Sequence, residues 1–139
     1  MRKTLIALIA AGFVALPAFA GALTLQVEEL ATNKEAMAKK AAVVAHTTAC
    51  HSPEKTTITA TAEGIVNGKL QTIPLKVMNL SEPGVYAVAQ EWPRQGLWTV
   101  RLVATNPDYQ NYATSVTVPV RGANAKVADA KVFYYTTAD

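Results

Sequence analysis

Hydrophobic and polar residues alternate along most of the chain between residues 56 and 120. In residues 57–62, Ile58 and two alanines occupy every second position, and three threonines lie between them. Successive side chains of a strand point to opposite faces, so this alternation predicts a β-strand with one buried face. Residues 97–105 repeat the pattern, and the position of Trp98 in it marks this tryptophan as a core residue.

Turn-forming residues separate the alternating segments at intervals of roughly 8 to 14 residues, the spacing of an antiparallel sandwich. The pair Asn67-Gly68 tolerates positive φ at both positions and predicts a two-residue type I′ hairpin. We therefore expect an all-β fold, an immunoglobulin-like antiparallel β-sandwich of about seven strands. The predicted strands are residues 23–28, 41–49, 56–66, 69–78, 85–90, 97–105 and 115–120.

The return strand of the hairpin, residues 69–78, is predicted as one continuous element. Its alternation sends Ile73, Leu75 and Val77 inward. Pro74 has no N–H to donate to a neighbouring strand, so this strand is expected at a sheet edge or at a bulge.

Two segments leave alternatives open. Asn33 is an acceptable N-cap for the helix formers that follow, but β-branched residues come next, so residues 33–42 are expected to be a loop or a brief helical turn. Residues 123–139 form a C-terminal extension that either adds an edge strand or drapes over the domain. The predicted sandwich domain covers residues 21–122.

Residues 1–20 have the pattern of a cleaved secretory signal peptide. Arg2 and Lys3 precede an apolar run, and small residues at Ala18 and Ala20 fit a cleavage site. The run is shorter than the about 20 apolar residues that a membrane span needs. We therefore expect a periplasmic or secreted protein with no stable membrane insertion after cleavage.

The basic character of the chain belongs largely to this targeting segment. Without Arg2 and Lys3 the formal net charge falls from +3 to +1. The remaining chain contains no lysine or arginine cluster of the kind that follows phosphate groups, which argues against nucleic acid as a partner.

Cys50 is the only cysteine, and both histidines, His46 and His51, lie close to it in the sequence. Thiolate and imidazole bind zinc and copper, so Cys50 with His51 or His46 is a candidate metal site. On a strand, His46 and Cys50 would be about 13 Å apart, so one ion would take Cys50 and His51 only if the backbone kinks there. The favoured interpretation is nevertheless a buried, inert Cys50 with ordinary surface histidines, and an intermolecular disulfide is a further alternative. Met37 and Met78 are expected to fill gaps in the packing, although thioethers also bind copper(I).

The sequence predicts no enzyme. It contains no glycine-rich phosphate loop, no zinc-binding cysteine pair and no serine-centred elbow, and its glutamates are scattered. A small exported enzyme on the same scaffold is the weaker alternative. A binding or interaction module with no catalytic function and no cofactor fits better.

Three aromatic residues outside the predicted core are candidates for contact with a protein partner or a small ligand. Trp92 precedes a turn and is expected to be partly exposed. Tyr134 and Tyr135 lie in the C-terminal extension, where they either pack onto their own domain or form part of an exposed apolar patch.

The sequence between about residues 80 and 120 resembles a known family. A Pro-Gly-Val-Tyr strand at residues 83–86, a Trp-Pro turn at 92–93 and a Gly-Leu-Trp strand at 96–98 are similar to the later half of the periplasmic immunoglobulin-like domains of the YtkA-like and FixH-like families. The resemblance implies an exported, non-catalytic sandwich, in families sometimes associated with copper handling or oxidase assembly. The chain departs from membrane-bound members because it has no retained membrane span and no methionine- or histidine-rich ligand motif.

Overall fold

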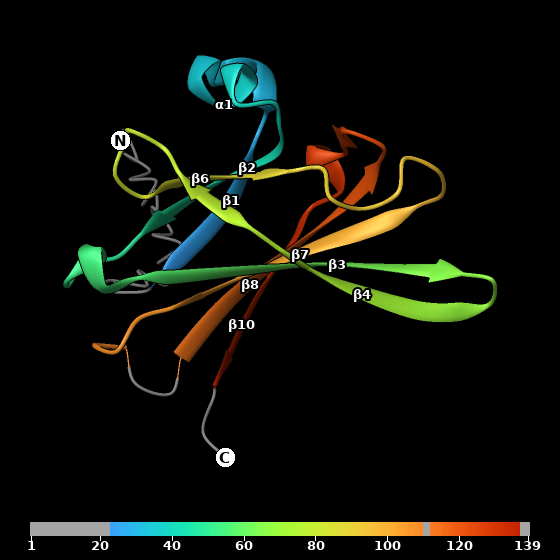
Figure 1. The fold of residues 1–139 in the computed structure, drawn as a ribbon. Helices are drawn as coiled ribbons and strands as arrows, with labels where there is room; N and C mark the ends of the chain where they lie inside the picture. The colour runs from blue at the N-terminus through green and yellow to red at the C-terminus, as the bar shows by residue number, and fades with distance from the viewer. Residues whose placement is uncertain (1–22, 110–111, 137–139) are drawn as a thin grey trace, which may run out of the picture.

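The computed structural model describes residues 23–109 and 112–136 of the chain (Figure 1). The signal peptide predicted for residues 1–20 lies outside the described residues. Within the described part, no helix is long and apolar enough to cross a membrane.

The described chain forms ten strands, one α-helix and three short 3₁₀ turns. In chain order these are β1 (Thr24–Glu28), η1 (Leu30–Thr32), α1 (Lys34–Ala38), β2 (Ala41–Thr48), η2 (Pro53–Lys55), β3 (Thr57–Val66), β4 (Lys69–Leu75), β5 (Val77–Asn79), β6 (Val85–Ala89), β7 (Trp98–Thr105), β8 (Tyr112–Arg121), β9 (Asn124–Ala125), η3 (Val127–Asp129) and β10 (Lys131–Thr136).

These strands form two antiparallel sheets. Sheet A has the order β1-β2-β6-β5, and sheet B has the order β10-β8-β7-β3-β4, with β9 paired to β8. The main core lies between the sheets and contains Trp98, Val100 and Leu102 of β7, all of them buried. This confirms the predicted fold class, an all-β antiparallel β-sandwich, and the predicted inward position of Trp98.

A second, smaller core lies on the other face of sheet A. Helix α1, at the top of Figure 1, covers part of this face, and Ala36 packs with Val44 and Leu80. The backbone N–H of Ala36 donates to Oδ1 of Asn33 at 2.9 Å, so Asn33 is the N-cap of a helix of five residues. The brief helical turn is thus the correct alternative for residues 34–38, and β2 follows it as predicted.

The hairpin between β3 and β4 closes as predicted. Asn67 and Gly68 have φ of 51° and 75°, and Val66 pairs with Lys69. Strand β4 is an edge strand of sheet B, in agreement with the expectation from Pro74.

The prediction of one continuous strand over residues 69–78 is wrong. The chain leaves sheet B after Leu75 and joins sheet A at Val77. At Lys76, between the two strands, the backbone N–H donates to Oε2 of Glu91 at 3.1 Å, so a side chain satisfies it.

The C-terminal extension adds an edge strand. Strand β10 pairs with β8 over six residues, from Lys131 opposite Thr117 to Thr136 opposite Tyr112. The strand count is ten instead of about seven because β4 and β5 are separate and because β9 and β10 follow Arg121.

Candidate functional site

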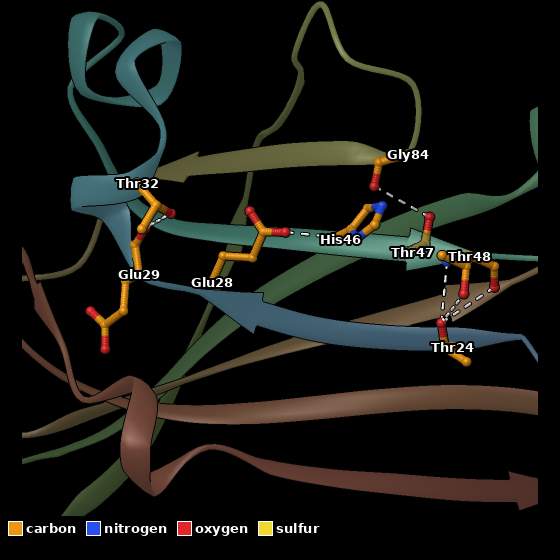
Figure 2. Close-up of polar contacts among 8 residues, drawn as sticks. All are labelled: Thr24, Glu28, Glu29, Thr32, His46, Thr47, Thr48 and Gly84. Atoms are coloured by element: carbon orange, nitrogen blue, oxygen red, sulfur yellow. Dashed lines mark hydrogen bonds and ion pairs between the residues drawn. The ribbon is translucent and has the colours of Figure 1, made fainter.

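His46 lies on the face of sheet A that α1 partly covers, and its neighbour there is a carboxylate (Figure 2). Nδ1 of His46 is 3.6 Å from Oε1 of Glu28, across the β1–β2 pair. Both side chains are about one-third exposed. His46 is therefore a half-exposed residue whose imidazole faces an acidic group.

The end of β2 is fixed by contacts that Figure 2 also shows. The hydroxyls of Thr24 and Thr48 are hydrogen bonded to each other, and the backbone N–H of Thr48 donates to Thr24 Oγ1 at 3.2 Å. The carbonyl of Gly84 accepts from the Thr47 hydroxyl at 3.5 Å, the bond drawn in Figure 2, and from the backbone N–H of Thr47 at 2.8 Å. Gly84 has a φ of 80°, and a Cβ at this position would lie 2.7 Å from the carbonyl oxygen of Thr47. A glycine is thus required where this turn approaches β2.

Cys50 and His51 lie beyond the end of β2, on the surface. The thiol of Cys50 is free and exposed, so the expectation that Cys50 is buried is wrong. The physical reason is that β2 ends at Thr48 and the chain then turns outward into η2. His51 is exposed as expected, and its backbone N–H donates to the hydroxyl of Tyr109 at 3.0 Å.

The turn that contains η2 lies beside the turn that follows β7, and polar side chains connect the two turns. The side-chain amide of Asn106 donates to the carbonyl of Ser52 at 2.9 Å and to Oγ1 of Thr56 at 3.0 Å. Nζ of Lys55 lies 3.4 Å from Oδ1 of Asp108. The pKa of Asp108 is lowered, chiefly by a hydrogen bond with the Ser52 side chain and then by the positive charge of Lys55 and its hydrogen bond. These polar groups mostly form hydrogen bonds and an ion pair with one another, which indicates that their role is to hold the two turns in place.

A shallow hollow lies between the two turns. It is lined by His51, Ser52, Pro107, Asp108, Tyr109 and Tyr112. The rings of His51 and Tyr109 are tilted, with their centroids 6.5 Å apart. The hollow contains an imidazole and a carboxylate, but the carboxylate is already paired with Lys55.

The structure does not add further ligands to the predicted metal site. Within residues 23–109 and 112–136, no three histidine, cysteine, aspartate or glutamate side chains are grouped so that they could hold a metal ion. Binding of zinc or copper by Cys50 with one imidazole stays a prediction. Met37 is 52% exposed in α1, so the expectation that it fills a gap in the packing is wrong, whereas Met78 packs against the smaller core as expected.

Both tryptophans are buried. Trp92 is only 3% exposed, so the expectation of a partly exposed contact residue before the turn is wrong. Its Nε1 donates to the carbonyl of Gly122 at 2.8 Å, and its ring packs in the main core. Trp92 is therefore a structural residue that joins two distant turns.

A group of exposed apolar side chains lies at the C-terminal edge of sheet B. Of the nine large hydrophobic side chains that are exposed among the described residues, five lie on β10 or opposite it. We call these five residues the β10 patch: Tyr112, Val132, Phe133, Tyr134 and Tyr135. Tyr134, at 63%, is the most exposed of them.

The two faces of β10 are both apolar and both exposed. Phe133 and Tyr135 lie opposite Ser115 and Ala113, on the side of sheet B that faces away from the core. Tyr134 lies opposite Thr114, whose hydroxyl donates to the carbonyl of Leu23, a main-core residue just before β1, so Tyr134 is on the inward side. Its exposure means that β10 extends sheet B past the cover provided by β1.

Sequence reasoning identified Tyr134 and Tyr135 in this patch but missed the other three residues. A signal was available, because four large apolar residues follow one another at positions 132–135. A strand with one buried face alternates, whereas this run is apolar at every position and so leaves apolar residues on both faces.

Comparisons of the chain with family models, with curated proteins and with solved structures give no match. The class of the protein is therefore defined by its fold alone, a two-sheet antiparallel β-sandwich with an apolar edge strand.

Proposed function

We propose that the protein is an exported, non-catalytic binding module that takes up an extended polypeptide strand at the free edge of β10. The observation that carries this proposal is the β10 patch, in which Tyr134 is 63% exposed on a strand that has β8 as its one neighbour among the described strands. Exposed apolar patches of this kind are characteristic of protein interaction sites.

The backbone groups at the free edge of β10 would form hydrogen bonds with the added strand. An edge strand presents N–H and C=O groups with no partner in the sheet, and an extended segment that pairs with them continues the ladder. Main-chain hydrogen bonds of this type contribute affinity whatever the sequence of the added strand. The exposed rings on both faces of β10 then select a strand that also carries apolar side chains.

The low charge of β10 favours a partner strand that also carries few charged side chains. Lys131 is the only charged residue of β10, and no acidic residue occurs in the strand. Burial of this edge would therefore require little desolvation of charge, which is otherwise costly at an interface.

A photoreactive residue tests the binding surface. Benzoylphenylalanine is incorporated at Tyr134, or at Leu70 as the control, and cells that export the protein are irradiated. Leu70 is 70% exposed on the other edge strand of sheet B, so it matches Tyr134 in exposure and in type of element. We expect a discrete adduct from position 134 and none from position 70. No adduct from 134, or the same adducts from both positions, would overturn the proposal.

Export has a separate test. The support for it is the charged start, apolar run and small-residue site in residues 1–20. N-terminal sequencing of the protein from the cell envelope or medium is expected to begin at Gly21. An intact N-terminus in the cytoplasm would contradict export without bearing on the β10 patch.

A further inference from the structure

We infer that the strand that pairs with β10 is β10 of a second copy of this chain, so that two sandwiches form an antiparallel dimer with one continuous sheet. The inference rests on the proposed binding surface and names its partner. Its basis is the symmetry of such a pairing, the distribution of apolar residues on β10, and the absence from β10 of the features that protect other edges.

The other free edges are blocked or short. Strand β4 carries Pro74, and β5 has only three residues. Strand β1 lies against β8, where Thr114 of β8 donates to the carbonyl of Leu23, the residue before β1. In contrast, β10 has six residues, contains no proline, and pairs with β8 in an unbroken register. It is the one edge among the described strands that is long, regular and apolar.

Symmetry restricts the register. A twofold axis perpendicular to the sheet keeps each face of β10 on the same face of the joint sheet, so residues opposite each other must have the same parity. With the axis at Tyr134, each Phe133 faces Tyr135 of the second copy, and the two Tyr134 side chains face each other. Every aromatic residue of β10 then lies opposite an aromatic residue. Moving the axis to Phe133 would place Lys131 opposite Tyr135 and lose two aromatic pairs.

The available area predicts a weak dimer. The four apolar side chains of β10 are between 39% and 63% exposed. Because a large aromatic side chain presents roughly 150–250 Å², they offer about 400 Å² per copy. With the edge of the backbone, two copies would bury about 1,000 Å² in total, the lower limit for a specific interface. The dimer is therefore expected to dissociate on dilution.

Charge does not oppose this pairing. In the register centred on Tyr134, the two Lys131 residues lie at opposite ends of the joined strands. The like charges are thus kept apart, and the centre of the interface contains only rings and backbone groups. This is the arrangement of an interface with an apolar centre and a polar rim.

Analytical ultracentrifugation of the purified exported protein over a range of concentrations tests the inference. We expect a monomer–dimer equilibrium. Tyr134→Lys places two like charges at the twofold axis and should raise the dissociation constant at least about tenfold, which corresponds to 1.4 kcal/mol. Leu70→Lys introduces the same charge on the β4 edge and should leave the equilibrium unchanged. Both positions are exposed, so circular dichroism is expected to show an intact fold.

A disulfide test examines the register. In a Cys50→Ala background, Tyr134→Cys puts two thiols opposite each other, within the Cα separation that a disulfide tolerates. Mild oxidation should give a covalent dimer much faster than Leu70→Cys does. A protein that sediments as a monomer at every concentration, or a dimer that Tyr134→Lys leaves intact, would overturn the inference. A monomer whose position 134 still crosslinks to a different protein would refute the dimer and leave the proposed function standing.

Discussion

The indole ring of Trp98 lies directly on the backbone of Gly64, its partner on the neighbouring strand. The two residues are opposite each other in the β3–β7 pair. A Cβ atom at Gly64 would lie 2.5 Å from Cδ2 of Trp98, closer than any real contact. Trp98 is 2% exposed, so its ring has no free space to move into. The absence of a side chain at Gly64 is what allows the largest ring of β7 to enter the core.

Gly64→Ala should therefore destabilise the fold. Overpacking of a filled core costs about 1–3 kcal/mol, and the free energy of unfolding from urea titration should fall by that amount. A double-mutant cycle with Trp98→Leu provides the control, because a smaller side chain leaves room for the added methyl group. An equal cost of Gly64→Ala with tryptophan or leucine at position 98 would show that the contact is not the cause.

A buried hydroxyl links the two sheets near the start of the described chain. Oγ1 of Thr114 in β8 donates to the carbonyl of Leu23 at 2.7 Å, and both residues are almost fully buried. Thr114→Val keeps the shape but removes the donor, so we expect a loss of about 1–3 kcal/mol in the free energy of unfolding. Thr117→Val, on the other face of β8, should change stability by less than about 0.5 kcal/mol. Equal effects of the two substitutions in urea titrations would refute the role of the hydrogen bond.

The alternation of hydrophobic and polar residues was enough to predict most strands. It does not reveal that the chain passes from sheet B to sheet A at Lys76. Ile73 lies in β4 and Val77 in β5, and both pack against the same main core. A strand that crosses from one layer of a sandwich to the other continues to face the shared interior, so its alternation is not interrupted. The break depends on pairing partners, β3 for β4 and β6 for β5, which lie elsewhere in the sequence.

The environment of Trp92 and the exposure of Cys50 also depend on distant parts of the chain. Trp92 is buried because its indole N–H reaches the carbonyl of Gly122, thirty positions further along the sequence. Cys50 is exposed because the turn after β2 is held outward against Asn106 and Tyr109. Local patterns carry no information on either contact. In contrast, Asn33 and Asn67 act through their own neighbours, and both were interpreted correctly.

Acid should weaken the attachment of α1 to sheet A. The carboxylate of Glu35 accepts hydrogen bonds from the backbone N–H and the hydroxyl of Ser81 and lies 3.1 Å from Nζ of Lys39. The Ser81 N–H, and then Lys39, lower the pKa of Glu35 from its usual 4.5. A lowered folded-state pKa means that the stabilisation is complete above pH 4.5 and is lost as the pH falls through the folded-state pKa.

Glu35→Gln tests this pH dependence. The variant removes the charge but keeps an oxygen that can accept from Ser81. We expect its melting temperature to lie below that of the unmodified protein at neutral pH and the difference to shrink towards about pH 3. Glu54→Gln, at an exposed position of η2, is the control. A difference that stays constant or grows on acidification would contradict the role assigned to the ionised Glu35.

A metal titration examines the predicted use of Cys50. Its thiol is exposed, whereas the imidazole of His46 lies 3.6 Å from Glu28 on the face of sheet A that α1 partly covers. We therefore expect any zinc or copper that binds to use Cys50 with His51, and to bind more weakly than in a closed site of four protein ligands. Cys50→Ala and His51→Ala should each abolish binding in isothermal titration calorimetry, and His46→Ala should leave it unchanged. Binding that survives Cys50→Ala, or that is lost in His46→Ala, would place the ion elsewhere on the chain.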